Sequence, residues 1–479
     1  MRWILFFVAL PTIAATCDKL VALHLTNTTI TAADRMPNSS ICRVAATLKP
    51  TDDSDIKVEV WMPESGWNGK YQAVGNGGWS GSINTNALQE ATRRGYAASS
   101  TDTGHVGSSA SFAVGHPEKL IDYAYRSEHE MAVAAKAIIT AFYGKGPSLS
   151  YWNGCSAGGK QALKEAQRYP EDFDGMVAGA PAANWTARAA QSLWVAQAMH
   201  KEEASYIPPA KYPAIHRAVL AACDRLDGVE DGVLESPRAC SFDPQVLECR
   251  GADSAECLTA PQVRAARAVY GPSINPRTKQ PLYPGLERGS ELGWAVWGGP
   301  KPLGTGLDHF RFVVLANPQW EFRTLDFDRD IARAEELDAK RINALDPDLR
   351  PFFAHGGKLI QYHGWNDPQI SPGNSVDYYA SVLEKLGGTA AVSGSYRLFM
   401  VPGMAHCGGG DGTSSFDMVS ALEQWREEKK APERIPASRV RNGKVDRTRP
   451  LCPYPQVAVY KGTGNTDDAN NFTCGNPSR

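Results

Sequence analysis

The chain has 479 residues and a mass of 51.9 kDa, enough for one large domain with an insertion or for two to three smaller domains. Its 50 basic and 52 acidic residues nearly cancel, so no overall positive charge attracts a polyanion, which argues against a nucleic-acid-binding protein. The 12 Trp, 17 Tyr and 15 Phe residues argue against a disordered chain, because so many aromatic side chains can fill a core.

The first sixteen residues have the organisation of a secretory signal peptide. Arg2 gives a positive start, residues 3–10 are almost wholly apolar, and small residues at 14–16 suit a signal peptidase. A membrane anchor is the alternative, but this apolar run is too short to cross about 30 Å of hydrocarbon. We therefore expect residues 1–16 to be removed and the mature protein to be secreted, extracellular or periplasmic, without a membrane partner.

The cysteines fit the same compartment. Ten cysteines form an even set, and in an oxidising compartment an even set usually forms disulfide bonds. The sequence leaves the connectivity open, but close spacing favours three local pairs, Cys223–Cys240, Cys249–Cys257 and Cys452–Cys474. That choice would leave Cys17 with Cys42 and Cys155 with Cys407. Four Asn-x-Ser/Thr sequons would be glycosylated only in a host that modifies secreted proteins: Asn27, Asn38, Asn184 and Asn471.

Strand and helix patterns alternate over the first part of the chain. The patterns predict strands over 56–62, 71–74, 95–100, 149–152 and 176–178, and helices over 118–143 and from the end of a turn at 153–159 to about 168. This alternation predicts a parallel α/β sheet.

The regular alternation stops between about 182 and 345. This stretch contains four of the cysteines, many prolines and glycines, and a group of aromatic residues comprising Trp294, Trp297, Phe310, Phe312, Trp320, Phe322 and Phe327. Strand patterns resume at 358–362 and 396–401, and an amphipathic helix follows over 416–428. We interpret 182–345 as a lid domain inserted into an α/β catalytic domain that consists of residues 17–181 and 346–479.

The segment from Gly154 to Gly158 fits the G-x-S-x-G pattern of a nucleophile elbow. It lies between an expected strand and an expected helix, where a sharp turn needs glycine because a Cβ would collide with the neighbouring backbone. Ser156, at the centre of the pattern, is therefore the predicted nucleophile.

A serine nucleophile needs a base to remove its proton, and the base needs an acid that fixes its tautomer. In α/β-hydrolases these residues follow in the order Ser, Asp, His. Asp367 follows the expected strand 358–362 and His406 follows the expected strand 396–401, so both lie at carboxyl ends of strands, where such sites assemble. His105 and His363 are the alternative bases, and we expect His363 to line the site or to pack beneath it.

The neighbours of the predicted nucleophile and base add two expectations. A disulfide between Cys155 and Cys407 would hold the two catalytic loops together and would restrict the unfolded chain by roughly 5 kcal/mol. The expected oxyanion donors are the N–H of Ala157 and that of Gly77 or Gly78, unless these glycines only form a tight loop.

These residues resemble the CS-D-HC arrangement of the tannase and feruloyl esterase family, with Cys-Ser at 155–156, Asp367, and His-Cys at 406–407. Gly-Asn-Gly-Gly at 75–78 and Ser-Thr-Asp-Thr-Gly-His at 100–105 are also similar to that family, so the resemblance covers nearly all of the mature chain. It implies an α/β-hydrolase fold with a large lid and hydrolysis of aromatic acid esters. Feruloyl esterase B, tannase and mono(2-hydroxyethyl) terephthalate hydrolase, which is similar in its five-disulfide pattern, belong to the family.

An acidic segment in the predicted lid indicates a metal site. Asp224, Asp227 and Asp231 place three carboxylates within eight residues, a density that favours a hard cation, although the spacing is not that of an EF-hand. The segment looks like the calcium loop of the same family. The resemblance implies that the three Asp side chains and the backbone carbonyls of Val229 and Val233 bind a structural Ca²⁺, whereas the alternative is a solvated acidic turn.

The sequence therefore predicts a secreted serine esterase that forms an aromatic acyl-enzyme. Feruloyl or related hydroxycinnamoyl esters are the first expected substrates, galloyl esters the second and a terephthalate monoester the third. A non-catalytic, calcium-stabilised binding protein is the alternative from another class. We expect most lid aromatics to form the lid's own core, and nothing singles out Arg311 or Arg323 as a partner for a substrate carboxylate.

Overall fold

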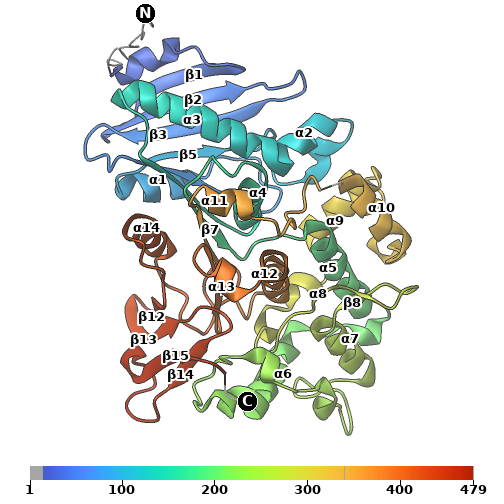
Figure 1. Ribbon diagram of the computed structural model, residues 1–479. Coiled ribbons are helices and arrows are strands. Elements are labelled where there is room, and N and C mark those ends of the chain that lie inside the picture. The colour runs from blue at the N-terminus through green and yellow to red at the C-terminus, as the bar shows by residue number, and fades with distance from the viewer. Residues whose placement is uncertain (1–13, 339, 478–479) are drawn as a thin grey trace, which may run out of the picture.

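The computed structural model describes residues 14–338 and 340–477, so residues 1–13 of the expected signal peptide lie outside the described residues. A nine-stranded sheet forms the centre of the molecule, in the order β1-β2-β3-β5-β4-β6-β7-β10-β11 (Figure 1). The strands of this sheet are β1 (Thr28–Arg35), β2 (Ile41–Leu48), β3 (Ile56–Pro63), β4 (Lys70–Val74), β5 (Ala97–Thr101), β6 (Leu149–Cys155), β7 (Gly175–Gly179), β10 (Lys358–Gly364) and β11 (Tyr396–Val401).

The sheet is parallel over most of the predicted strands, as expected, but mixed as a whole, because the predicted strand 56–62 pairs antiparallel. β1, β2, β3 and β5 pair antiparallel to one another, whereas the strands from β5 to β11 pair in parallel. The sequence analysis missed β1 and β2. β2 alternates between buried and half-buried residues along its whole length, because an antiparallel sheet can bury one face and leave the other partly in water.

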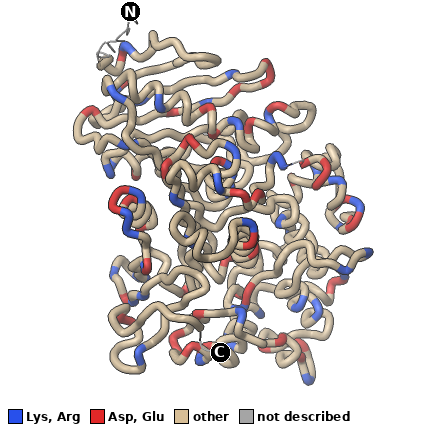
Figure 2. Tube along the Cα trace, in the orientation of Figure 1, with Lys and Arg blue, Asp and Glu red and all other residues tan. Residues whose placement is uncertain are grey.

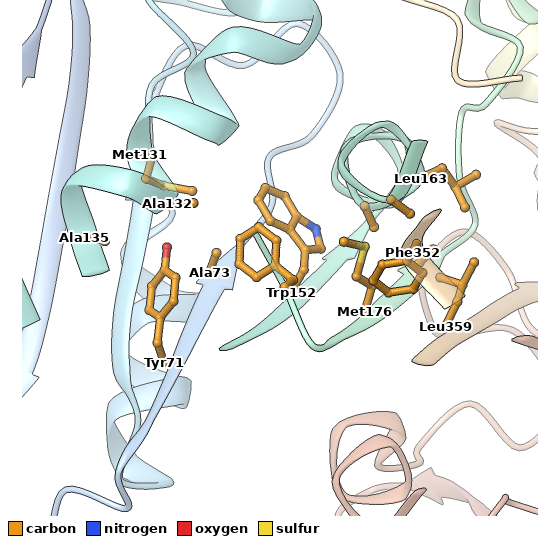
Figure 3. Packing of buried hydrophobic residues seen from close by; sticks show 14 of the residues in the cluster. Tyr71, Ala73, Met131, Ala132, Ala135, Trp152, Leu163, Met176, Phe352 and Leu359 are labelled. Atoms are coloured by element: carbon orange, nitrogen blue, oxygen red, sulfur yellow. The ribbon is translucent and has the colours of Figure 1, made fainter. Parts of the chain in front are cut away.

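Helices cover both faces of the sheet. One face carries α3 (Ser127–Tyr143), α4 (Ala157–Arg168) and α12 (Gly373–Leu386), and the other carries α1 (Thr85–Arg93) and α14 (Met418–Glu428). Figure 3 shows the core of the first face, where the fully buried Trp152 of β6 lies between Met131 of α3 and Leu163 of α4. The expected helix 118–143 is interrupted, because α2 (Pro117–Ile121) passes through a π-helical turn at Asp122–Arg126 before α3 begins.

Between β7 and β10 the chain leaves the sheet and forms a mainly helical lid. Its helices are α5 (Trp185–Met199), α6 (Tyr212–Cys223), α7 (Ala260–Tyr270), α8 (Ala295–Gly298), α9 (Gly304–Asp308) and α10 (Arg329–Asp338), and α11 (Arg350–Ala354) leads back to the sheet. A short hairpin joins β8 (Ser273–Ile274) to β9 (Pro281–Tyr283). Six of the seven lid aromatics are buried in two cores that the lid itself forms, as expected, whereas Phe312 packs against a cluster beside Ser156.

The last part of the chain forms two hairpins that the sequence analysis missed. They pair β12 (Ile435–Arg441) with β13 (Lys444–Leu451) and β14 (Val457–Tyr460) with β15 (Phe472–Gly475). α13 (Thr389–Val392) precedes β11. In the second hairpin, Ala458 and Phe472 pack against Val229, so the C-terminal hairpins cover the acidic segment of the lid.

All ten cysteines form disulfides, in the pairing that spacing favoured: Cys17–Cys42, Cys155–Cys407, Cys223–Cys240, Cys249–Cys257 and Cys452–Cys474. Basic and acidic residues are intermixed over both the sheet and the lid (Figure 2), in line with their nearly equal numbers. Within the described ranges, none of the helices combines the length and apolar character needed to span a bilayer.

Candidate active site

Ser156 occupies a strained turn between β6 and α4. Its backbone has φ 65° and ψ −122°, a conformation that L-residues rarely adopt. A Cβ on Gly154 would lie 2.6 Å from the backbone of Gly158, and a Cβ on Gly159 would lie 2.2 Å from the carbonyl oxygen of Gly179. Only glycine fits at these two positions, and this is the close packing that a nucleophile elbow requires.

Backbone hydrogen bonds fix this elbow to its neighbours. The N–H of Ser156 donates to Gly179 O at 2.9 Å, and the N–H of Gly158 donates to Asn76 O at 2.8 Å. The Ser156 side chain is half-buried, and its hydroxyl makes no hydrogen bond to any residue of the described chain. The hydroxyl is therefore available to an incoming group.

The predicted acid and base are in direct contact. Asp367 is fully buried in the loop after β10, and its Oδ2 accepts a hydrogen bond from Nδ1 of His406 at 2.7 Å. Its Oδ1 accepts from the N–H groups of Gln369 and Ile370 at 2.7 and 3.0 Å. Burial alone would raise the pKa of Asp367, but the interactions with His406 and His363 hold it well below its usual range. The ionised carboxylate thus keeps the proton on His406 Nδ1. His406 Nε2 is then the ring nitrogen that can accept a proton.

The structure places both alternative histidines in supporting positions. His363 is fully buried, and its Nε2 lies 3.1 Å from both Asp367 Oδ2 and the Ile370 carbonyl oxygen, while Nδ1 lies 2.7 Å from the Ser375 hydroxyl. Two acceptors at Nε2 make this nitrogen the donor, so His363 holds Asp367 from beneath. His105 is also buried, and its Nε2 donates to the carbonyl of Trp79 at 2.9 Å, which fixes the glycine loop.

A disulfide joins the loops that carry the predicted nucleophile and base. Cys155 precedes Ser156 and Cys407 follows His406, and their Cα atoms lie 6.0 Å apart although 252 residues separate them. Cys407 has φ 61°, so the backbone is left-handed at Cys407 as well as at Ser156. The disulfide keeps the base loop beside the nucleophile elbow.

The expected oxyanion donors have free N–H groups within the described chain. Ala157 is the first residue of α4, so its N–H has no partner within the helix. The N–H groups of Gly77 and Gly78 also take part in no described hydrogen bond, whereas Gly78 O accepts from the Tyr123 hydroxyl at 2.6 Å. Tyr123 lies in the π-helical turn before α3, so this turn holds the glycine loop in place.

An aromatic wall that the sequence analysis missed borders the elbow. Trp79, Tyr123 and Trp185 are buried in one cluster with Ala157, and the rings of Trp79 and Trp185 lie 4.8 Å apart. Trp79 follows the glycine loop directly and Trp185 begins α5 of the lid, so this wall joins sheet and lid. The signal in the sequence was the position of Trp79 immediately after the Gly-Asn-Gly-Gly cluster.

The acidic segment of the lid lies away from this wall, beneath the C-terminal hairpins. Asp227 accepts hydrogen bonds from the N–H groups of Val229 and Glu235 at 2.9 and 3.2 Å. Asp231 accepts from Val233 N–H at 3.1 Å, and Asp224 accepts from Gly232 N–H at 2.9 Å. All three carboxylates are therefore turned into the loop.

The charges around this loop do not balance. Burial raises the pKa of Asp227 to about 6 and that of Glu235 to about 8. Glu235 is then mostly neutral at pH 7, and the three Asp carboxylates face two guanidinium groups, with Arg447 at 3.2 Å and Arg449 at 2.5 Å from Asp231 Oδ2. A divalent cation would compensate the excess negative charge, and the carboxylate and carbonyl donors suit Ca²⁺.

The three Asp carboxylates of the loop are not all within 4.8 Å of one another, so they are further apart than in a closed coordination shell. Among the described residues, the one set of three potential ligand groups that meets this distance is Cys249, Asp253 and Cys257. Their two sulfurs are joined in a disulfide, so they do not form a metal site. The acidic loop thus fits a cation by charge and donor type, and its carboxylates would have to move closer together to bind one.

The fold and the site define an α/β-hydrolase with an esterase-like Ser, Asp, His arrangement, and comparison with known proteins agrees. The family described as "Tannase and feruloyl esterase" matches residues 42–475. The chain is 38% identical to an uncharacterized esterase of Xanthomonas campestris pv. campestris, with 96% of this chain and 91% of that protein covered. It is 35% identical to a probable feruloyl esterase B-2 of Aspergillus terreus, covering 92% of this chain and 88% of that protein.

Solved structures support the same assignment. The crystal structure of feruloyl esterase B from Aspergillus oryzae superimposes with a TM-score of 0.89 at 30% identity, covering 96% of this chain and 99% of that chain. Tannin acyl hydrolase from Aspergillus niger shares the fold, with a TM-score of 0.81 at 22% identity over 95% of this chain and 94% of that chain. The chain belongs to the tannase and feruloyl esterase family and is an esterase of that family.

Proposed function

We propose that the chain is a secreted serine esterase that cleaves esters of aromatic acids through an acyl-enzyme. The observation that carries this proposal is the Asp367–His406 hydrogen bond, held beside the Ser156 elbow by the Cys155–Cys407 disulfide. A buried carboxylate, an oriented imidazole and an unpaired serine hydroxyl are the three groups that nucleophilic acyl transfer needs.

In this mechanism Ser156 Oγ attacks the ester carbonyl carbon while His406 Nε2 takes the hydroxyl proton. The N–H of Ala157, with that of Gly77 or Gly78, stabilises the oxyanion of the tetrahedral intermediate. The intermediate collapses, the ester C–O bond breaks, and His406 returns its proton to the leaving alkoxide. Water then attacks the acyl-enzyme, with His406 again as the base, and releases the acid and free Ser156.

The aromatic wall supports a planar acyl group, because Trp79, Tyr123 and Trp185 lie beside the residue that follows the nucleophile. Feruloyl or other hydroxycinnamoyl esters are the first proposed substrates, since several relatives bear the name feruloyl esterase B. Galloyl esters and a terephthalate monoester are the second and third. A calcium-stabilised binding protein without catalysis is the competing function.

The test is a comparison of kcat/KM on methyl ferulate, methyl gallate and a terephthalate monoester, with p-nitrophenyl acetate as the reference and Ser156→Ala as the blank. The proposal expects preference for one aromatic ester and its loss in the variant. A fluorophosphonate probe should label Ser156 in the oxidised protein. Absence of both turnover and labelling would favour the binding protein.

We also propose that Asp224, Asp227 and Asp231, with the carbonyls of Val229 and Val233, bind a structural Ca²⁺ in the lid. The excess of buried carboxylates supports this role. The ion would neutralise the loop and hold it against the C-terminal hairpins, away from the reacting atoms. Secretion is supported by the five disulfides, and N-terminal sequencing of the exported protein tests cleavage after the expected signal peptide.

A further inference from the structure

One buried cation beside the aromatic wall forms no ion pair. Arg188 of α5 is only 4% exposed, and no carboxylate of the described residues lies within ion-pair distance of it, although the charge of Asp367 favours it from further away. Its Nη2 donates to Thr305 Oγ1 at 2.6 Å and its Nη1 to Gln369 O at 3.4 Å, while the buried Nε has no partner. Burying a charge without a direct ion-pair partner is costly, so this position favours an electronegative ligand.

Three residues that interact with this guanidinium also carry an unpaired polar atom. Trp185 Nε1, Tyr283 Oη and His309 Nδ1 are all buried and have no hydrogen-bond partner in the described chain. The Arg188 guanidinium carbon lies 5.2 Å from the Trp185 ring centroid, and the charge of Arg188 reaches both Tyr283 and His309. Unpaired buried polar atoms are rare in native proteins, so four in one neighbourhood indicate a group that they bind together.

The neighbourhood adjoins the candidate active site. Thr305, which accepts from Arg188, would touch a Cβ on Gly78 at 3.3 Å. Gln369, the other partner, donates its own N–H to Asp367. Trp185 packs in the cluster that contains Ala157. The residues that carry the unpaired atoms therefore contact the glycine loop, the Asp367 loop and the start of α4.

Neither of the two arginines considered in the sequence analysis lies beside the aromatic wall. Arg311 donates to the carbonyl of Trp320 inside the lid core, and Arg323 is exposed. Arg188 is thus the arginine that the fold brings next to the aromatic wall.

We propose that Trp185 and Arg188 form an oxygen-binding subsite of the acyl pocket, which takes a hydroxyl or carboxylate substituent on the aromatic ring of the acyl group. The proposal deepens the proposed esterase function and rests on it. Both groups are donors only, so they select an acceptor oxygen, and the fixed positive charge favours an anionic oxygen over a neutral one.

The first experiment compares three methyl esters that differ in one ring substituent: methyl benzoate, methyl 4-hydroxybenzoate and monomethyl terephthalate. For Arg188→Met, the kcat/KM on monomethyl terephthalate divided by that on methyl benzoate should fall about 10- to 100-fold, as for a lost charged hydrogen bond. Trp185→Phe keeps an aromatic ring but lacks the N–H. In this variant, the kcat/KM on methyl 4-hydroxybenzoate divided by that on methyl benzoate should fall roughly 3- to 10-fold. The exposed Arg323→Met is the matched control and should leave both ratios unchanged.

An equal loss on all three esters in both variants would reduce Arg188 and Trp185 to structural roles and overturn the subsite. Melting temperatures of the variants separate that outcome from simple unfolding. If Arg188→Met does not fold, Trp185→Phe and Arg188→Lys carry the test, and unchanged ratios in both would overturn the proposal.

The second experiment measures binding without catalysis. Calorimetric titration of Ser156→Ala with benzoate, 4-hydroxybenzoate and terephthalate should show tighter binding of the oxygenated acids, and adding Arg188→Met should remove the difference. If the wild-type protein cleaves no ester while this difference persists, the esterase function fails and the subsite stands. If esters are cleaved but the three acids bind equally, the unpaired atoms hold only buried water and the subsite is wrong.

Discussion

The sheet and the lid position their functional residues in different ways. On the sheet, Ser156 directly follows β6, Asp367 comes three residues after β10, and His406 five residues after β11. Backbone pairing of neighbouring strands therefore brings the catalytic groups together. In the lid, Arg188 and Thr305 meet although 117 residues separate them, and a side-chain hydrogen bond between α5 and α9 joins them. The predicted catalytic residues thus depend on backbone geometry, whereas the proposed acyl subsite depends on side-chain contacts.

This comparison predicts that the largest losses come from the sheet. Asp367→Asn should lower kcat by about 10⁴-fold, because an amide no longer stabilises the imidazolium or fixes the correct tautomer of His406. Steady-state kinetics on the preferred aromatic ester measures the effect, and the exposed Asp346→Asn is the control. More than a tenth of wild-type kcat in Asp367→Asn would show that another group acts as the acid.

A second prediction compares a disulfide of the catalytic loops with one of the lid. Replacing Cys155 and Cys407 by Ser should lower kcat by roughly 10²-fold, since a misplacement of about 1 Å between base and nucleophile costs that much. Without the first disulfide, the free energy of unfolding should fall by about 5 kcal/mol, because the unfolded chain becomes less restricted. Removing the control pair Cys249 and Cys257, which closes only 8 residues, should lower it by about 2.5 kcal/mol. Steady-state kinetics measures the change in kcat, and urea unfolding measures the change in the free energy of unfolding. Near-normal turnover without the first disulfide would mean that it does not position the catalytic pair.

A third prediction concerns the acidic loop of the lid. Chelation by EDTA should lower the melting temperature, and Ca²⁺ should restore it better than Mg²⁺, because the loop offers several oxygen donors in a flexible arrangement. An ion present at 100 times its Kd would contribute about 2.7 kcal/mol to stability. Asp227→Asn should lose the Ca²⁺ response. A melting temperature that does not respond to either treatment, in protein free of calcium by elemental analysis, would contradict the site.

The last prediction concerns the contact between lid and sheet. Burial, and then the neighbouring Lys160, lower the pKa of Lys164 to about 7, and its Nζ donates to the carbonyl oxygens of Lys340 and Asn343. The unfolded lysine binds its proton up to about pH 10.5, so the unfolded state holds more protons than the folded state above pH 7. Stability should therefore rise with pH from 7 towards 10.

Lys164→Met should remove this rise, and urea unfolding at several pH values measures it. The exposed Lys145→Met is the control and should keep the wild-type slope. Identical slopes in wild-type protein and Lys164→Met would show that Lys164 keeps its proton when the protein folds.

Local sequence rules were sufficient for the residues that follow the parallel strands. The G-x-S-x-G turn, and the Asp and His after later strands, gave the order of the predicted triad without coordinates. The same rules missed β1, β2 and the C-terminal hairpins, because an antiparallel strand with one partly exposed face has a weak hydrophobic pattern. The rules also did not predict the antiparallel pairing of β3, since strand direction depends on long-range pairing.

The sequence by itself determined the elbow, the catalytic residue types and their order, and the even cysteine set, because each is written in a few neighbouring residues. Only the tertiary structure decided which atoms His363, expected beneath the site, contacts, that His105 holds the glycine loop, and that Arg188 is buried without an ion pair. These roles depend on contacts between segments far apart in the chain. A side chain's environment is set by whatever packs against it, and no local pattern encodes that neighbour.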